Sequence, residues 1–183
     1  MNIKKNLFAT LLLALSLTLA GCGNDEKENQ KEKEETHEGM DHSGSGKVPK
    51  DLKEATNPTF EVGSQAIINA DHMKGMNGAE ATIVGAYDTT VYTVSYTPTT
   101  GGKKVTDHKW VIHEEIKDAG DQALKPGTKV ILNADHMKGM KGAKGTIDSA
   151  ERTTVYMVDY IPTTGGEKVA NHKWVTESEL SAE

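Results

Sequence analysis

A ten-residue segment rich in histidine and methionine occurs twice, at residues 70–79 (ADHMKGMNGA) and 134–143 (ADHMKGMKGA). Imidazole and thioether groups are soft ligands that suit Cu(I). Spacings of three and four residues allow such side chains to share one face of a turn. The segment therefore predicts one copper site in each copy, with the following ligands: His72, Met73, Met76, His136, Met137 and Met140.

The aspartate before each histidine, Asp71 or Asp135, is expected to accept a hydrogen bond from the imidazole and so to orient it toward the metal. A structural interpretation is equally open, because methionine is also an adaptable core filler. In that alternative, Met73 or Met76 closes the end of a small core, and Asp71 and His72 only cap a turn. Duplication does not separate the two interpretations, because a copied core residue also occurs twice.

Further histidines extend the candidate set. Residues 37–42 (HEGMDH) combine histidine with methionine in a polar segment, where no core exists to explain them. Two other histidines stand two positions before a tryptophan, hence on the same strand face, and are interpreted first as histidines packed beside the core. A second interpretation makes them copper ligands. The further candidates are His37, Met40, His42, His108 and His172.

The N-terminus is typical of a secreted lipoprotein. Lys4 and Lys5 precede an apolar run, residues 7–19, that is too short for a permanent membrane span. Residues 19–22 (LAGC) resemble a bacterial lipobox, which predicts a signal peptide over residues 1–21 and lipidation of Cys22. Two acyl chains would anchor the protein to the cell membrane at its extracytoplasmic face. Cys22 is the only cysteine, so no disulfide or thiol chemistry is expected in the mature protein.

The segment after the lipidation site is strongly polar. Residues 23–57 hold ten acidic and six basic side chains and few apolar ones. Such a composition buries too little surface to fold. We therefore expect residues 22–57 to form a flexible tether between the anchor and the rest of the chain.

The rest of the chain is a tandem duplication. At a constant offset of 64, residues 60–116 match residues 124–180 without a gap and are identical at 33 of 57 positions. A unit of this length can fold alone. The sequence therefore predicts two domains, 58–117 and 122–183, joined by a connector at residues 117–123.

Each repeat is expected to be all-β. Short apolar or β-branched runs flanked by turn residues are typical of strands. Several short strands in under sixty residues favour a small SH3-like barrel, of the KOW-like type because a glycine-rich loop follows the first strand. The strands are expected near residues 66–68, 81–84, 89–97 and 108–111, and at their counterparts in the second repeat.

Composition weighs against two classes of function. No nucleophile elbow, repeated carboxylate pair, phosphate loop or dinucleotide fingerprint occurs, so we do not expect an enzyme. Residues 58–183 hold 17 acidic and 13 basic side chains, a net charge of −4, which argues against nucleic acid as a partner. The remaining alternative to copper binding is a non-enzymatic module that binds cell-wall polymer or another protein, with the methionines as core.

The repeated pattern ADHMKGM-x-GA, TTVY-x-V-x-Y, PTTGG and HKWV behind a lipobox resembles the YdhK-type lipoproteins of Gram-positive bacteria. The resemblance covers residues 60–180 and implies a membrane-tethered extracytoplasmic protein. Copper-resistance members of that family imply Cu(I) binding and protection alongside a copper-exporting ATPase. The sequence therefore predicts a monomeric, lipid-anchored protein that sequesters Cu(I).

Overall fold

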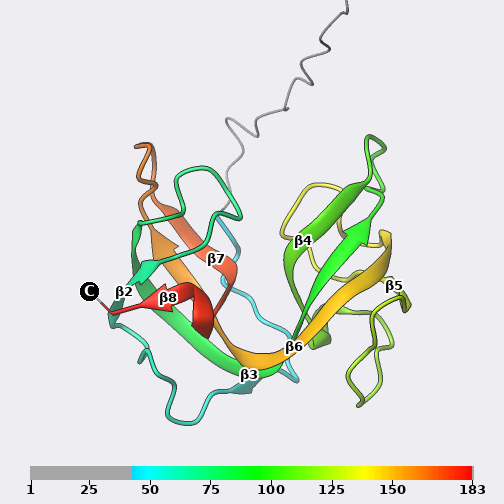
Figure 1. Ribbon diagram of the computed structural model, residues 1–183, viewed down its shortest axis with the longest axis horizontal. Helices are drawn as coiled ribbons and strands as arrows, with labels where there is room; N and C mark the ends of the chain where they lie inside the picture. The colour runs from blue at the N-terminus through cyan, green and yellow to red at the C-terminus, as the bar shows by residue number, and fades with distance from the viewer. Residues whose placement is uncertain (1–42, 183) are drawn as a thin grey trace, which may run out of the picture. The chain divides into compact units, whose positions relative to one another are not determined.

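The computed structural model describes residues 43–182 and is built from antiparallel strands (Figure 1). The elements are β1 (Lys53–Glu54), β2 (Gln65–Ile68), β3 (Glu80–Tyr96), β4 (Val105–Ile112), η1 (His113–Glu115), β5 (Lys129–Ile131), β6 (Lys144–Tyr160), β7 (Val169–Thr176), η2 (Glu177–Glu179) and β8 (Leu180–Ser181). The two η elements are single 3-10 turns. Within the described part of the chain, no helix is long and apolar enough to cross a membrane. The all-β prediction is confirmed.

Strands β3 and β6 dominate the sheet. Each has 17 residues, so each extends about 55 Å at the usual rise of about 3.3 Å per residue. They pair antiparallel from Ala81↔Tyr160 to Tyr96↔Gly145, with register shifts near each end. The sequence predicted two short strands at 81–84 and 89–97, but β3 continues through the residues between them. Pairing with β6 stabilises that stretch as strand.

The sheet curves into two lobes, which lie on either side of the β3–β6 crossing in Figure 1. We call them the terminal lobe and the central lobe. The core of the terminal lobe combines residues 66–86 with residues 156–180, and it includes Ile68, Met76 and Tyr156. The core of the central lobe combines residues 92–116 with residues 130–147, and it includes Tyr92 and Met140.

Each lobe therefore contains half of each repeat, and this differs from the expectation of one barrel per repeat at 58–117 and 122–183. The physical reason is the length of β3 and β6, since a strand that long leaves one lobe and enters the other. The described residues belong to one compact unit with one open antiparallel sheet. The finer assignment to SH3-like barrels stays a prediction.

A third hydrophobic cluster lies between the two lobe cores. It contains Trp110 and Trp174 together with Leu52, and Val48 packs against it. Strand β1 pairs with β3 at Tyr87 and Asp88. The structure thus orders residues 43–57, so the expected tether, 22–57, is too long at its C-terminal end. Leu52 is buried in this cluster and Val48 packs against it, and these contacts, with the β1–β3 pairing, hold an otherwise polar segment to the sheet.

Candidate functional site

In both copies of the decapeptide the loop wraps around its second methionine. Met76 and Met140 are fully buried, at 0% exposure, in the cores of the terminal and central lobes. The Met76 amide donates to the Met73 carbonyl, and the Ala79 amide donates to the Met76 carbonyl, so the chain turns tightly about this residue. Met76 and Met140 therefore pack as core residues, as the structural interpretation expects.

The PTTGG turn of the other repeat holds each loop in place. The Thr163 amide donates to the Gly75 carbonyl at 2.8 Å, and the Thr99 amide donates to the Gly139 carbonyl at the same distance. Gly75 has a φ of +79°, and a Cβ there would lie 2.6 Å from the Thr164 hydroxyl oxygen. Only glycine fits such a position without strain. The same contact recurs at Gly139, where a Cβ would lie 2.5 Å from the Thr100 hydroxyl oxygen.

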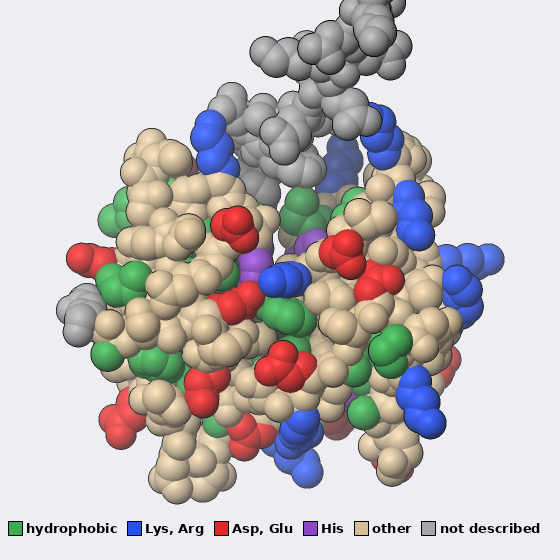
Figure 2. Space-filling model, in the orientation of Figure 1, with side chains coloured by type: hydrophobic (Ala, Val, Ile, Leu, Met, Phe, Trp, Pro, Cys, Tyr) green, Lys and Arg blue, Asp and Glu red, His purple; other side chains and the backbone are tan. Residues whose placement is uncertain are grey.

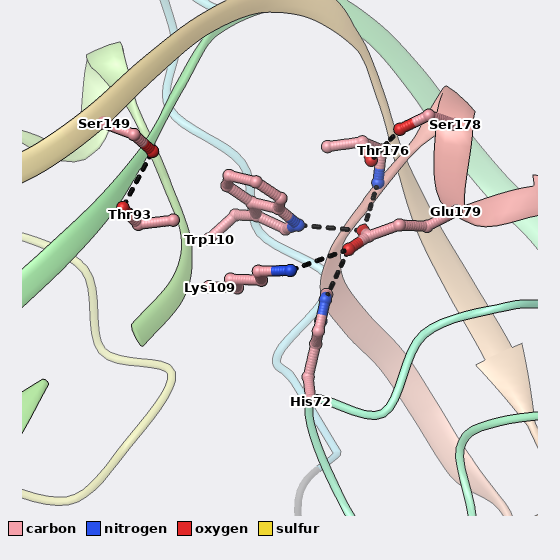
Figure 3. Close-up of polar contacts among 8 residues, drawn as sticks. All are labelled: His72, Thr93, Lys109, Trp110, Ser149, Thr176, Ser178 and Glu179. Carbon is pink, nitrogen blue, oxygen red and sulfur yellow. Dashed lines mark hydrogen bonds and ion pairs between the residues drawn. The ribbon is translucent and has the colours of Figure 1, made fainter. Parts of the chain in front are cut away.

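In the first copy of the decapeptide, the histidine is held by a partly buried carboxylate of the other repeat (Figure 3). His72 Nε2 lies 2.8 Å from Glu179 Oε1, and the indole N–H of Trp110 donates to Glu179 Oε2 at 2.8 Å. The Thr176 amide donates to the same oxygen at 3.1 Å. Lys109 Nζ approaches Oε1 at 3.8 Å. Glu179, on the 3-10 turn η2, thereby joins a loop of the terminal lobe to strand β4.

The second copy builds the same arrangement around Glu115, on η1. His136 Nε2 lies 2.8 Å from Glu115 Oε1, and the indole N–H of Trp174 donates to Glu115 Oε2 at 3.0 Å. The Ile112 amide also donates to Oε2, at 3.3 Å. Both histidine side chains are more than nine-tenths buried, with His72 at 7% and His136 at 8% exposure.

These contacts keep both glutamates ionised. Burial alone would raise the pKa of Glu179, but the hydrogen bond and charge of His72, with the Thr176 amide and the Trp110 indole, lower it to about 2. Burial opposes ionisation of Glu115 as well, yet His136, Trp174 and the Ile112 amide hold its pKa below the ordinary value. A carboxylate that accepts N–H bonds in a buried site is stabilised in its charged form.

A third histidine lies close to these two. The rings of His108 and His136 are 6.4 Å apart between centroids. Burial, together with the nearby His136 and His72, lowers the pKa of His108 to about 4, against an opposing effect of Glu115, so its imidazole is neutral near pH 7. His172, the counterpart of His108 on β7, packs edge-on against Tyr160. Figure 2 shows histidine side chains in the hollow between the lobes.

Three ring nitrogens of these histidines are buried without a hydrogen-bond partner within the described residues: His72 Nδ1, His136 Nδ1 and His108 Nε2. Nε2 of His72 and of His136 donates to a carboxylate, so Nδ1 is the ring nitrogen left for a metal, which would displace the Nδ1 proton wherever the ring is charged. A histidine fixed by a carboxylate in this way is typical of metal ligands. Across residues 43–182, however, no three His, Cys, Asp or Glu side chains converge on one metal position.

The other predicted site residues divide into three groups. Met73 and Met137 are partly buried and pack against the lobe cores next to their histidines. Asp71 and Asp135 are exposed, and the acceptors bonded to the imidazoles are instead Glu179 and Glu115. The remaining candidates lie outside the described residues: Cys22, His37, Met40 and His42.

Sequence reasoning missed these two glutamates. Each lies in a short polar run, directly after Glu114 or Ser178. Such a run is typical of a turn exposed to solvent. One signal was present, because Glu115 and Glu179 are identical at the offset of 64 whereas the three residues before them differ between the repeats. Identity confined to one residue of a polar turn indicates a specific contact.

Comparison with known proteins gives the chain a family. The family model described as a protein of unknown function (DUF1541) matches residues 62–113 and 126–177. The uncharacterized protein YdhK of Bacillus subtilis (strain 168) is 62% identical over 187 residues, which cover 100% of this chain and 91% of the relative.

Two crystal structures of ydhK from B. subtilis also match. The first, at 2.00 Å resolution, is 71% identical, covers 80% of this chain and 100% of its own, and has a TM-score of 0.77. The second is 74% identical, covers 66% and 98%, and has a TM-score of 0.65. The family model matches one span in each repeat, as the duplication predicts. The chain therefore belongs to the DUF1541 family and is a relative of YdhK.

Proposed function

We propose that the chain is a lipid-anchored extracytoplasmic protein that binds Cu(I) and lowers the free copper concentration at the membrane surface. The observation that carries the proposal is the set of buried, unpaired nitrogens on His72, His108 and His136. Such nitrogens are unfavourable in a buried site unless a ligand satisfies them. Imidazole suits copper, and the thioether of methionine suits its Cu(I) state.

The proposal assigns one site to each lobe. In the central lobe, His136 and His108 provide the nitrogens. In the terminal lobe, His72 and His172 occupy the same repeat positions. With a metal–nitrogen bond of about 2 Å, rings whose centroids are 6.4 Å apart reach one ion after a small side-chain movement. Met73 and Met137 are the proposed thioether ligands, whereas Met76 and Met140 are assigned to the core.

The cellular setting of the proposal comes from the N-terminal pattern and from resemblance. The lipobox provides the anchor at Cys22 and hence the location at the outer face of the cell membrane. The resemblance to the copper-resistance lipoprotein CopL adds a role beside a copper-exporting ATPase. In that role the protein would hold copper outside the cell before it returns to the cytoplasm, without catalysing a reaction.

The test is a titration of the full chain with Cu(I) against a competing chelator. Replacing His72 and His136 with Gln should weaken binding at least tenfold, since even a partner behind a ligand contributes about 10- to 100-fold. The matched control is His113→Gln, which removes a histidine that bonds Tyr92 and the Gly120 carbonyl and has no counterpart in the second repeat. Equal affinity of the folded double variant and the control would overturn the lobe sites.

Two further variants separate the remaining ligands. Met73→Leu with Met137→Leu should weaken binding, while Met76→Leu with Met140→Leu should leave it unchanged in a folded protein, because Leu keeps most of the apolar volume. Replacing His37, Met40 and His42 with Gln, Leu and Gln tests the upstream segment. Loss of all copper in that last variant would place the metal outside the lobes.

A non-enzymatic interaction module is the second candidate. Full burial of Met76 and Met140 favours it, because the two methionines then need no metal to explain them. SH3-like modules on secreted bacterial proteins often bind wall polymer. In this alternative each lobe is an SH3-like module. Retention of the metal-free protein on purified cell wall, with no copper affinity, would support it over the copper proposal.

A further inference from the structure

Neither repeat completes a core alone. The terminal-lobe core needs Ile68 and Met76 from the first repeat and Tyr156 and Leu180 from the second. The polar bridges cross in the same way, since Glu179 binds His72 and Trp110, and Glu115 binds His136 and Trp174. Each repeat therefore presents a surface whose complement is the other repeat.

The register of β3 and β6 makes this complementarity two-fold. Thr89 pairs with Thr153, and these two residues are the same position of the repeat, 64 residues apart. On either side, Asp88 pairs with Thr154 and Thr90 pairs with Arg152, which are again reciprocal positions. A contact in which position i meets j while j meets i is isologous, the arrangement of a two-fold dimer. The chain is thus a dimer of repeats joined by a connector.

The path of the connector determines whether the first repeat pairs with the second repeat of the same chain or of another copy. Residues 117–123 run from the end of the first repeat back into the central lobe, where the Leu124 amide donates to the Tyr92 hydroxyl. Asp118 and Gly120 have φ values of +53° and +73°, which reverse the chain direction. Apart from the half-buried Ala119, the connector side chains are exposed. Few interactions would be lost if the connector took another path.

We propose that two copies of this chain exchange repeats to form a closed dimer, in which the first repeat of each copy pairs with the second repeat of the other. Every core contact, β3–β6 pair and Glu–Trp bridge of the monomer recurs in the dimer, and only the connector changes course. Exchange of identical elements is a low-cost route to dimers. The monomer is favoured in dilute solution, and dimers form when chains refold together at high concentration.

A cysteine pair across the two-fold tests the exchange. Full chains with Cys22→Ser, which removes the only native cysteine, carry either Thr89→Cys or Thr153→Cys and are refolded together and oxidised. Directly opposed residues of antiparallel strands have Cα atoms about 4.5–5.5 Å apart, which suits a disulfide. A disulfide-linked heterodimer, of twice the monomer mass, is the expected product.

Two controls make the result decisive. Thr89→Cys chains refolded alone should not cross-link, because in the exchanged dimer each Thr89 faces Thr153 of the other copy and not a second Thr89. Deleting residues 118–121 removes the chain reversal, so the mass measured by light scattering should double. Folded chains that give no heterodimer with the intact connector, together with a folded monomeric deletion variant, would overturn the proposal. If the deletion variant fails to fold, the cross-link alone decides.

Discussion

The two histidine–glutamate–tryptophan arrangements use the same residue types at the same repeat positions, but their surroundings differ. Glu115 is 7% exposed at its side chain, whereas Glu179 is 12% exposed and has the Lys109 ammonium at 3.8 Å. Trp174 is fully buried, and Trp110 is 8% exposed. The two sites therefore share their residue types because of the duplication. Their solvent exposure differs because other parts of the chain pack against them differently.

The segment before β2 accounts for much of this difference. The Gly44 amide donates to the Ala170 carbonyl at 2.8 Å, so this segment runs beside β7. The Lys173 ammonium donates to the Lys47 carbonyl, while its counterpart Lys109 approaches Glu179. Tyr87 packs edge-on against Trp174 with centroids 5.7 Å apart, and the repeat counterpart of Tyr87 is Glu151. A feature present once in the sequence thereby makes two copied sites unequal.

The largest expected effects lie where the two lobes are alike. Met76→Ala and Met140→Ala should each lower the free energy of unfolding by about 2–5 kcal/mol, because each leaves a cavity in a closed core. Met73→Ala and Met137→Ala should have clearly smaller effects, since these side chains are partly exposed. Urea unfolding of the metal-free protein gives the comparison. Equal losses at all four positions would contradict the division into core and loop-surface methionines.

The second prediction compares the loss of stability when each of the two glutamates is replaced. Glu115→Gln is expected to lower the free energy of unfolding by about 3 kcal/mol, the upper part of the range for hydrogen bonds to charged groups. Glu179→Gln should lower it by about 1–2 kcal/mol, because Glu179 is more exposed and water can replace part of the loss. Both variants can be compared in one denaturant series. A larger loss for Glu179→Gln would show that exposure does not rank the two sites.

The sequence predicted the components of this fold better than their pairing. Period-two patterns and turn residues identified the strands, and an offset of 64 identified the repeats. That offset is equally compatible with pairing inside a repeat and with pairing across repeats, so the shared lobes could not be predicted. The stretch between residues 84 and 89 was not predicted as strand, yet long-range pairing with β6 makes it strand.

The candidate site was predicted in part for a related reason. Histidine and methionine are rare enough to stand out, so the sequence selects His72, His136 and His108 as candidates. Glu179 and Glu115, which contact His72 and His136, come from the opposite repeat to each histidine, and only the tertiary fold brings them together. The adjacent Asp71 and Asp135 were chosen because they are near in sequence, but the loop directs them to solvent.

Acid should weaken the fold through Glu179. Its folded pKa of about 2 lies below the ordinary value of 4.5. A lowered folded pKa contributes stability that is fully present above pH 4.5 and is lost as the pH falls toward 2. His108, with a folded pKa of about 4 against 6.5, contributes its own loss between pH 6.5 and 4. Urea midpoints measured from pH 4 to 2.5 should therefore fall in the wild type and fall less steeply in Glu179→Gln. Parallel slopes would contradict this assignment.

The smallest expected effect concerns the two lysines. Lys109 is about half exposed at its side chain, and an exposed ion pair of this kind contributes about 0–1 kcal/mol. Lys109→Ala should therefore change the free energy of unfolding by less than about 1 kcal/mol, and the change should shrink further in high salt, which screens the pair with Glu179. Both lysines lie over a tryptophan ring, Lys109 over Trp110 and Lys173 over Trp174. Lys173→Ala removes a hydrogen bond to a backbone carbonyl in place of an ion pair, so its effect should depend less on salt. Denaturation of both variants at low and high salt distinguishes the two cases. If both substitutions show the same salt dependence, the contact of Lys173 with the segment beside β7 does not distinguish the two lysines. The difference between the two glutamate sites then comes from burial alone.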